Sequence, residues 1–172
     1  MIPKVADAGY TNLICFSGNR NGMNDYVGLQ NCVDGLSKVM PLAEKHGVVL
    51  QMELFNQVNH PDYMCDSSLW GVELCRRLDS ENFKLLYDIY HMQKNEGNLI
   101  HNMDLTWEEI AYIQIGDNPG RKEPTTGEIN YKNIFKWIHE KGFEGILGME
   151  HGNSQQGKTG EQAVIDAYRK VD

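Results

Sequence analysis

The chain has 172 residues and a formal net charge of −8. This length fits one domain, and the mixture of apolar and charged residues is that of a globular protein. The acidic balance argues against a nucleic-acid backbone or an anionic membrane as the partner, and no apolar run of about 18 residues occurs that could span a bilayer.

The first ten residues lack a basic segment followed by an apolar one, so they do not resemble a signal peptide. None of the four cysteines belongs to a CxxC pair. We therefore expect reduced thiols in a cytoplasmic protein, with the reservation that an export signal on a longer parent chain could not be seen in this sequence.

Short apolar strands alternate with amphipathic helices along the chain. In chain order we expect a strand at residues 11–18, a helix at 25–46 that Gly47 ends, a strand at 48–56, a helix at 69–79, a strand at 83–91, a short helix within 99–109, a strand at 111–117, a helix at 131–141, a strand at 145–150 and a helix at 161–170. This alternation predicts right-handed βαβ crossovers and a parallel sheet. An open doubly wound sheet and a (β/α)₈ barrel compete, and the absence of a GxGxxG or GxxxxGK turn favours the barrel.

Four successive predicted strands each carry a carboxylate or a carboxamide near the carboxyl end. These residues are separated by 35, 26 and 36 positions, about one βα unit each, and they are Glu53, Asp88, Gln114 and Glu150. A lone acid in an apolar strand costs several kcal/mol unless it is paired or ligated. In a parallel barrel the carboxyl ends of the strands converge on the site face, so these side chains should meet there.

Three anionic groups gathered in one place repel each other unless a cation lies among them. Oxygen ligands from Asp, Glu and Gln suit Mg²⁺ or Mn²⁺ rather than Zn²⁺ or copper. The competing interpretation is a set of unrelated acids at a solvated rim of the sheet. The pattern favours a metal site over that interpretation.

Two further residues are weaker candidates. A lone histidine such as His91 is more often a structural hydrogen-bonding group than a ligand. Arg121 is most simply a solvated loop charge, but its loop follows the strand of Gln114 and would cover the site. A guanidinium there would suit a substrate carboxylate.

Two segments, YDIYHMQKNEGN (87–98) and IQIGDNPGRKEPTTGEINY (113–131), closely resemble the signature segments of the hydroxypyruvate isomerase family. GVVLQMELFN and GILGMEHG resemble the strands that carry the first and last glutamates of that family. The resemblance implies a xylose-isomerase-like TIM (β/α)₈ barrel within the sugar isomerases and epimerases. It covers nearly the whole chain, which would be a single domain over residues 1–172.

The resemblance also implies one divalent cation, Mg²⁺ or Mn²⁺, held by Glu53, Asp88, Gln114 and Glu150. Glu53 and Glu150 would transfer protons in an aldose–ketose type isomerisation through an enediolate, such as hydroxypyruvate to tartronate semialdehyde. His91, Arg121 and Glu128 would contact the substrate, a small hydroxy-oxo acid or sugar.

The chain departs from the family in two ways. The last strand continues as MEHGNS and the first glutamate lies in MELFN, and both segments touch the expected pocket. The barrel normally needs at least about 200 residues, so we expect the C-terminal portion of a barrel with about five βα units. Two open apolar edges should then favour a homo-oligomer.

Other functions remain open. An epimerase or isomerase of the same superfamily would share the site, and a truncated fragment could act only as a binding or assembly module. An abasic-site endonuclease fits less well because that chemistry uses a histidine-rich zinc cluster, whereas Gln114 lies at a potential histidine position.

Overall fold

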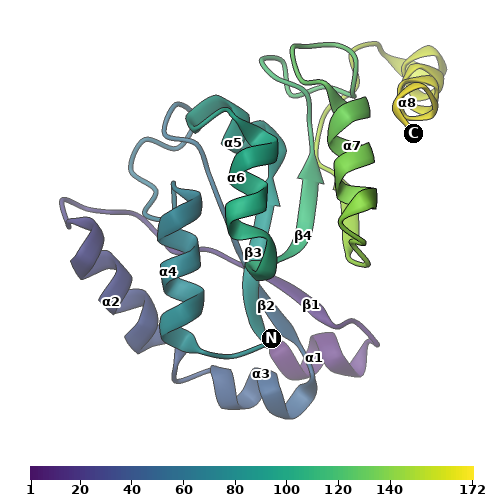
Figure 1. Cartoon of the computed structure of the whole chain (residues 1–172). Coiled ribbons are helices and arrows are strands. Elements are labelled where there is room, and N and C mark those ends of the chain that lie inside the picture. The colour runs from purple at the N-terminus through teal and green to yellow at the C-terminus, as the bar shows by residue number, and fades with distance from the viewer.

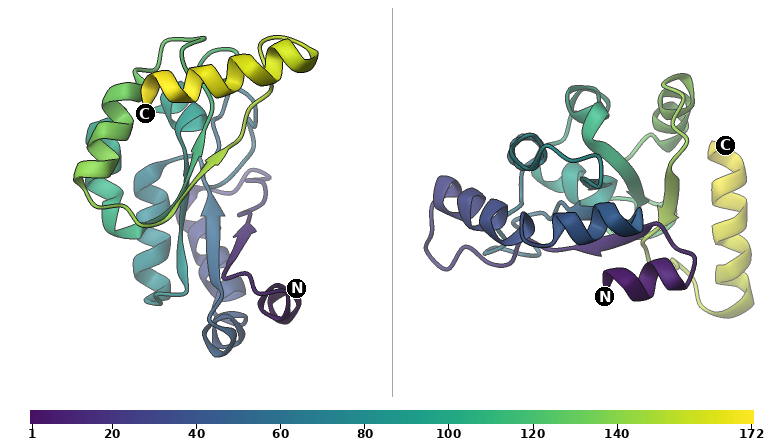
Figure 2. Two further views of the ribbon diagram at one scale, coloured as in Figure 1. Left: turned by 90° about the vertical axis from the view of Figure 1, so that its right-hand side faces the viewer. Right: turned by 90° about the horizontal axis from the view of Figure 1, so that it is seen from below.

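The computed structural model describes residues 1–172. Five parallel strands form one sheet in the order β1-β2-β3-β4-β5. The strands are β1 (Asn12–Cys15), β2 (Val49–Glu53), β3 (Phe83–Asp88), β4 (Ile110–Ile115) and β5 (Ile146–Met149). Chain neighbours are sheet neighbours throughout, and the sheet curls into an open half-barrel (Figures 1 and 2). The predicted incomplete α/β barrel with five strands is confirmed.

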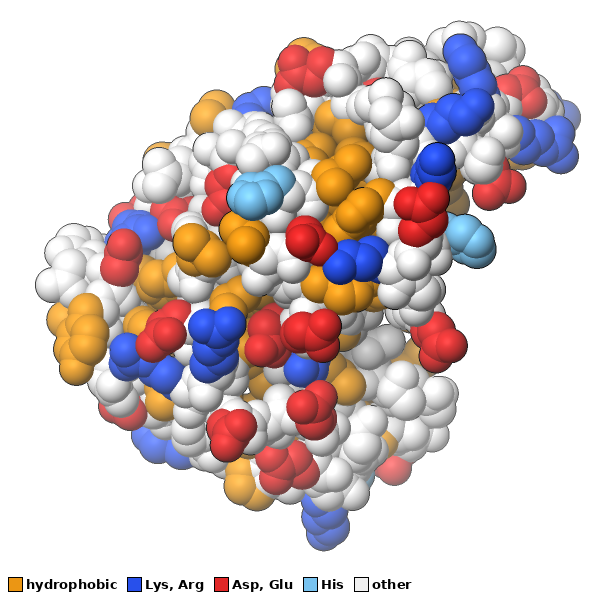
Figure 3. Space-filling view, in the orientation of Figure 1, with side chains coloured by type: hydrophobic (Ala, Val, Ile, Leu, Met, Phe, Trp, Pro, Cys, Tyr) orange, Lys and Arg blue, Asp and Glu red, His pale blue; other side chains and the backbone are white.

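Helices connect the strands and lie on the outer side of the arc, where α4, α6 and α7 stand side by side (Figure 1). The helices are α1 (Ile2–Asp7), α2 (Asp25–Leu36), α3 (Met40–His46), α4 (Ser68–Leu78), α5 (Ile89–Asn95), α6 (Leu99–Thr106), the 3₁₀ helix η1 (Trp107–Glu109), α7 (Tyr131–Glu140) and α8 (Gly157–Val171). The outer helix-covered face is a mixture of acidic, basic and apolar side chains (Figure 3). None of the helices has the length and apolarity needed to cross a bilayer.

The single helix predicted at residues 25–46 is wrong, because α2 and α3 are separate. Pro41 lies in the first turn of α3. Proline has no N–H to donate, and its ring would clash with the carbonyl four residues back, so a continuous helix cannot pass through this position. The predicted stop is confirmed, since Gly47 has φ 62° in the left-handed region that glycine adopts readily.

The strand predicted at residues 83–91 is also too long. It ends at Asp88, whose side chain accepts a hydrogen bond from the backbone N–H of His91 and caps α5. Aspartate is a strong helix N-cap, but the apolar Ile89 and Tyr90 that follow it extended the strand pattern in the sequence. His91 therefore lies on the first turn of a helix rather than on a strand.

The apolar core lies between the sheet and the outer helices. Alternate residues of β2 and β3 face it, as does Leu54 directly after β2, and they are fully or almost fully buried, among them Met52, Leu54, Phe83, Leu85 and Tyr87. The intervening residues face the inside of the arc and include Glu53 and Asp88. This period of two separates the packing residues from the polar ones along each strand.

Both edges of the sheet carry exposed apolar side chains. On β5, Ile146 and Met149 are 50% and 64% exposed, and Phe16 just after β1 is 59% exposed. Edge strands of this kind have unpaired backbone groups on one side. The two expected open apolar edges of the sheet are therefore present, one at β5 and the other at β1.

We predict that Leu85→Ala lowers the free energy of unfolding by about 2–5 kcal/mol, because it empties a fully buried position under α4. Leu69→Ala, at a position of α4 that is 63% exposed, should change it by less than about 0.5 kcal/mol. Chemical denaturation of both variants measures the difference. Equal effects would contradict this account of the core.

Candidate metal centre and active site

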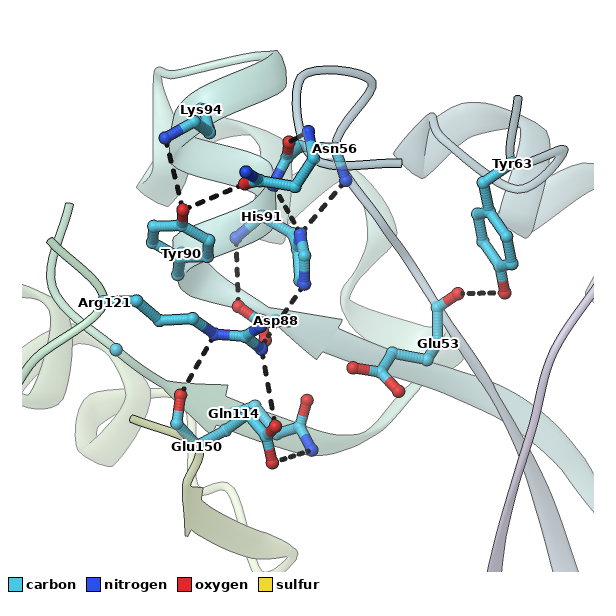
Figure 4. A network of polar contacts seen from close by, with 12 residues as sticks. Glu53, Asn56, Tyr63, Asp88, Tyr90, His91, Lys94, Gln114, Arg121 and Glu150 are labelled. Carbon is cyan, nitrogen blue, oxygen red and sulfur yellow. Dashed lines mark hydrogen bonds and ion pairs between the residues drawn. The ribbon is translucent and has the colours of Figure 1, made fainter. Parts of the chain in front are cut away.

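The four strand-end residues lie in one place on the inside of the arc (Figure 4). Glu53 ends β2, Asp88 ends β3, Gln114 lies in β4 and Glu150 follows β5 directly. Strand register brings Asp88 opposite Gln114, and the backbone N–H of Glu150 donates to the carbonyl of Ile115 at 3.0 Å. Hydrogen bonding between parallel strands thus fixes the relative heights of these side chains.

The amide of Gln114 lies between the acids. In one orientation its nitrogen donates to Glu150 Oε2 at 3.3 Å, and its oxygen lies 2.9 Å from Glu53 Oε1 and 3.2 Å from Asp88 Oδ2. In the other orientation the nitrogen donates to Glu53 and Asp88, and the oxygen faces Glu150. In either orientation the Gln114 oxygen lies against at least one carboxylate oxygen with no hydrogen between them. This set of oxygen ligands therefore fits a positive charge held at its centre.

Burial perturbs the acids of this cluster. Desolvation, followed by the neighbouring carboxylates of Asp88 and Glu150, raises the pKa of Glu53 to about 7. Desolvation also raises the pKa of Asp88 to about 6, although the His91 N–H and Arg121 both favour its charged form. Buried carboxylates whose negative charge is not fully neutralised by neighbouring groups, and whose pKa values are therefore raised, are typical of functional sites.

His91 is buried and oriented by Asn56. The backbone N–H of Asn56 donates to His91 Nδ1 at 3.1 Å, so the neutral ring carries its hydrogen on Nε2. Burial and the nearby Arg121 lower the pKa of His91 to about 3, which keeps the ring neutral. Its Nε2 has no hydrogen-bond partner and lies 3.8 Å from Asp88 Oδ2.

One oxygen each of Glu53 and Asp88 and one ring nitrogen of His91 lie within 4.8 Å of one another. A metal on Nε2 would require the hydrogen to lie on Nδ1, where Asn56 donates already. His91 therefore fits the role of a hydrogen-bond donor to a ligand better than that of a metal ligand.

Arg121 reaches into the cluster from the loop after β4. Its Nη2 lies 3.0 Å from Asp88 Oδ2 and 3.5 Å from Glu150 Oε1, and its Nε donates to the Glu150 carbonyl at 3.3 Å. The guanidinium also lies over the ring of Tyr90, 5.1 Å from its centre (Figure 4). Arg121 therefore lies at the site, as predicted for this loop.

Glu128 lies away from the four-residue cluster. Its exposed side chain accepts hydrogen bonds from the side-chain amides of Asn118 and, at 3.3 Å, Gln93. These contacts connect the loop to α5. The structure brings Glu53, Asp88, Gln114, Glu150, His91 and Arg121 together and leaves Glu128 at the loop surface.

Sequence reasoning missed the residue that folds this loop. The buried Asp117 accepts backbone N–H groups from Asn118 and Ile129 on one oxygen and from Gly127 on the other, at 2.8–3.1 Å. A Cβ on Gly127 would lie 2.0 Å from the Asn118 carbonyl oxygen, so only glycine fits there. An aspartate directly followed by Asn-Pro-Gly was the available signal of a side-chain-stabilised turn.

The comparisons with known proteins agree with the fold. The sequence matches the family described as "Xylose isomerase-like TIM barrel" over residues 3–171. The chain belongs to this family. The predicted resemblance to hydroxypyruvate isomerases within it is also confirmed by named relatives.

The chain is 35% identical over 137 residues to the hydroxypyruvate isomerase of Escherichia coli, covering 80% of the chain and 53% of that protein. It is 32% identical over 125 residues to the 2-oxo-tetronate isomerase of Haemophilus influenzae, covering 73% of the chain and 47% of that protein. The chain thus spans about half the length of the curated relatives it matches.

Solved structures share the architecture. A structure described as an AP endonuclease of family 2 from Brucella melitensis superposes with a TM-score of 0.83 at 24% identity, covering 97% of this chain and 67% of that one. A 3-keto-D-glucoside 4-epimerase from Escherichia coli gives 0.81 at 17% identity, covering 99% and 66%. Identities this low support the fold alone.

We predict that Glu53→Gln weakens the pH dependence of stability in the chelator-treated protein. A carboxyl whose folded pKa is raised from 4.5 to about 7 stabilises the fold fully below pH 4.5, and this stabilisation is lost as the pH rises to 7. Melting temperatures measured from pH 4 to 8 should fall more steeply through this window in the wild type than in the variant. Parallel curves would contradict the perturbed site.

Proposed function

We propose that the chain carries the metal-binding and proton-transfer residues of a divalent-metal-dependent isomerase acting on a small hydroxy-oxo acid. The observation that carries this proposal is the convergence of Glu53, Asp88, Gln114 and Glu150 at the carboxyl ends of four adjacent strands. The named isomerase relatives support the class of reaction. Hydroxypyruvate, interconverted with tartronate semialdehyde, is the substrate we propose first.

Mg²⁺ or Mn²⁺ is the cation that this set of oxygen donors suits best. When bound, it would act as a Lewis acid that polarises the substrate's carbonyl and so acidifies the adjacent C–H bond. Glu53, Asp88, Gln114 and Glu150 would hold it. The need for positive charge around the Gln114 amide supports this assignment.

Proton transfer falls to the two glutamates on either side of the cluster. With hydroxypyruvate, one carboxylate would remove a proton from C3 and a carboxylic acid would return one to C2. A second proton would pass from the C3 hydroxyl to the C2 oxygen, so that the C3 alcohol becomes the aldehyde and the C2 ketone becomes the hydroxyl. A carboxylate placed beside the reacting carbon can accept or return a proton, which is what general acid–base catalysis requires.

His91 and Arg121 would recognise the substrate. The unpartnered Nε2–H of His91 points into the site and can donate to a substrate oxygen. The guanidinium of Arg121 suits the substrate carboxylate. We propose for Glu128 an indirect role, in which it holds the loop that carries Arg121.

A longer oxo acid or a sugar is the second candidate substrate. The rings of Phe55 and His60 stack at 4.2 Å beside His91, and the largely exposed Phe16 lies 5.7 Å from Phe55. This aromatic wall offers more apolar surface than a three-carbon acid needs. The relative named 2-oxo-tetronate isomerase favours the same extension.

We predict that millimolar Mn²⁺ raises the melting temperature of the chain and that Glu150→Gln removes most of this rise. A ligand at about 100 times its Kd adds about 2.7 kcal/mol of stability. Glu144→Gln, an exposed acid before β5, is the matched control and should keep the Mn²⁺ effect. No Mn²⁺ effect in the wild type would overturn the metal site, and the chain would then be a binding or assembly module.

Activity follows as a separate readout. Mn²⁺-loaded protein should interconvert hydroxypyruvate and tartronate semialdehyde, and a panel of three- to six-carbon oxo acids and ketoses ranks the two candidate substrates. If only the longer substrates are turned over, the assignment of hydroxypyruvate as the substrate is wrong.

We further propose that the open edges make the chain self-associate. The exposed Ile146 and Met149 of β5 and Phe16 after β1 are the surfaces concerned. Light scattering at rising protein concentration should show species above the 19.6 kDa monomer, and Met149→Lys should reduce them because charged edge residues oppose strand pairing. A monomer at all concentrations would contradict this proposal.

A further inference from the structure

Arg121 is the only arginine or lysine that forms an ion pair with any of the four clustered residues. It contacts two of them, Asp88 and Glu150, and stands at their solvent side over the Tyr90 ring (Figure 4). Its guanidinium therefore partly neutralises carboxylates that would otherwise repel one another without compensation.

Asp88 turns one of its two oxygens, Oδ2, toward the Gln114 amide and the Arg121 guanidinium. Its Oδ1 accepts the backbone N–H of His91 at 3.0 Å and caps α5, while its Oδ2 accepts from Arg121 Nη2 at 3.0 Å. Oδ2 is also the oxygen that lies 3.2 Å from the Gln114 amide, on the side where the acids converge. A metal ion and the guanidinium thus require the same oxygen.

The backbone of Arg121 is held in place independently of its side chain. Its N–H donates to the Asp117 carbonyl at 2.8 Å, its carbonyl accepts from Gly152 at 3.1 Å, and its φ is 50°. The half-buried side chain is held by its ion pairs to Asp88 and Glu150 and by the Nε hydrogen bond to the Glu150 carbonyl, and none of these contacts involves the backbone of Arg121. The guanidinium can therefore leave the cluster without unfolding the loop.

We propose that Arg121 is the resident cation of the metal-free site and that a divalent ion displaces its guanidinium from Asp88. This inference rests on the metal site proposed above and describes its regulation. Two positive charges cannot share one carboxylate oxygen without strong repulsion in a half-buried site. Metal loading thus frees the guanidinium, at the rim of the site, for an anionic group of the substrate.

A titration of Arg121→Asn with Mn²⁺ tests the proposal. Binding is monitored through the relaxation of the bulk-water protons, a readout that does not depend on turnover. Asparagine tolerates positive φ better than most residues, so the backbone is retained. Lys122→Asn is the matched control, since it removes the same charge from the neighbouring position, and Lys122 makes no ion pair with the cluster. We expect Arg121→Asn to bind Mn²⁺ at least tenfold more tightly and Lys122→Asn to bind within twofold of the wild type.

A measurement on the unchanged protein guards against a variant that fails to fold. The Nε–H resonance of Arg121, which is hydrogen-bonded to the Glu150 carbonyl, should be observed by ¹⁵N NMR in the metal-free protein and should shift on addition of diamagnetic Mg²⁺. An unmoved resonance at saturating Mg²⁺ would overturn the displacement.

The outcomes separate this inference from the metal site itself. Equal or weaker Mn²⁺ binding by Arg121→Asn overturns the displacement but leaves the metal site intact. Absence of Mn²⁺ binding in both the wild type and Arg121→Asn overturns the metal site, and the displacement with it. Binding by Arg121→Asn alone, with none by the wild type, supports displacement in its strongest form.

Discussion

The mutual repulsion of three carboxylates on the inside of a parallel sheet is the constraint on which this structure depends. Glu53, Asp88 and Glu150 are brought together by the register of β2 to β5, which cannot change without moving every packing residue of these strands. The acids therefore cannot move apart to reduce their repulsion. The protein instead surrounds them with donors: the Gln114 amide, the His91 backbone N–H and the Arg121 guanidinium.

Two residues of the site, His91 and Arg121, are held in place by further groups outside the four-residue cluster. Asn56 fixes the tautomer of His91, and Asp117 folds the loop that presents Arg121. Tyr90 provides a ring on which the guanidinium rests. The site is thus a rigid oxygen cluster on strands with a more adaptable cationic rim on a loop, which suits a centre where charge must change during binding.

Much of this arrangement was readable from the sequence. Short apolar strands that each carry a carboxylate or carboxamide near the carboxyl end, at Glu53, Asp88, Gln114 and Glu150 and about one βα unit apart, predict both the strands and their meeting point. The helix break at Pro41 and the end of β3 at Asp88 were missed, because an apolar pattern continues through both places. The ion pair between Arg121 and Asp88 was not predictable, since it depends on how a loop of 15 residues between β4 and α7 folds back over the next strand.

The position of the cluster within the sheet separates metal binding from catalysis. All four proposed ligands lie on β2 to β5 or directly after them, and three neighbouring strand pairs fix their spacing without help from any other part of a barrel. Exclusion of water is a different requirement, since Glu150 is 48% exposed where the inner face of the arc is open. A low dielectric strengthens the electrostatic stabilisation of a transition state, whereas the positions of a set of ligands do not depend on it. The arc by itself therefore positions the four proposed ligands, while the proposed proton transfer would depend on what covers its open inner face.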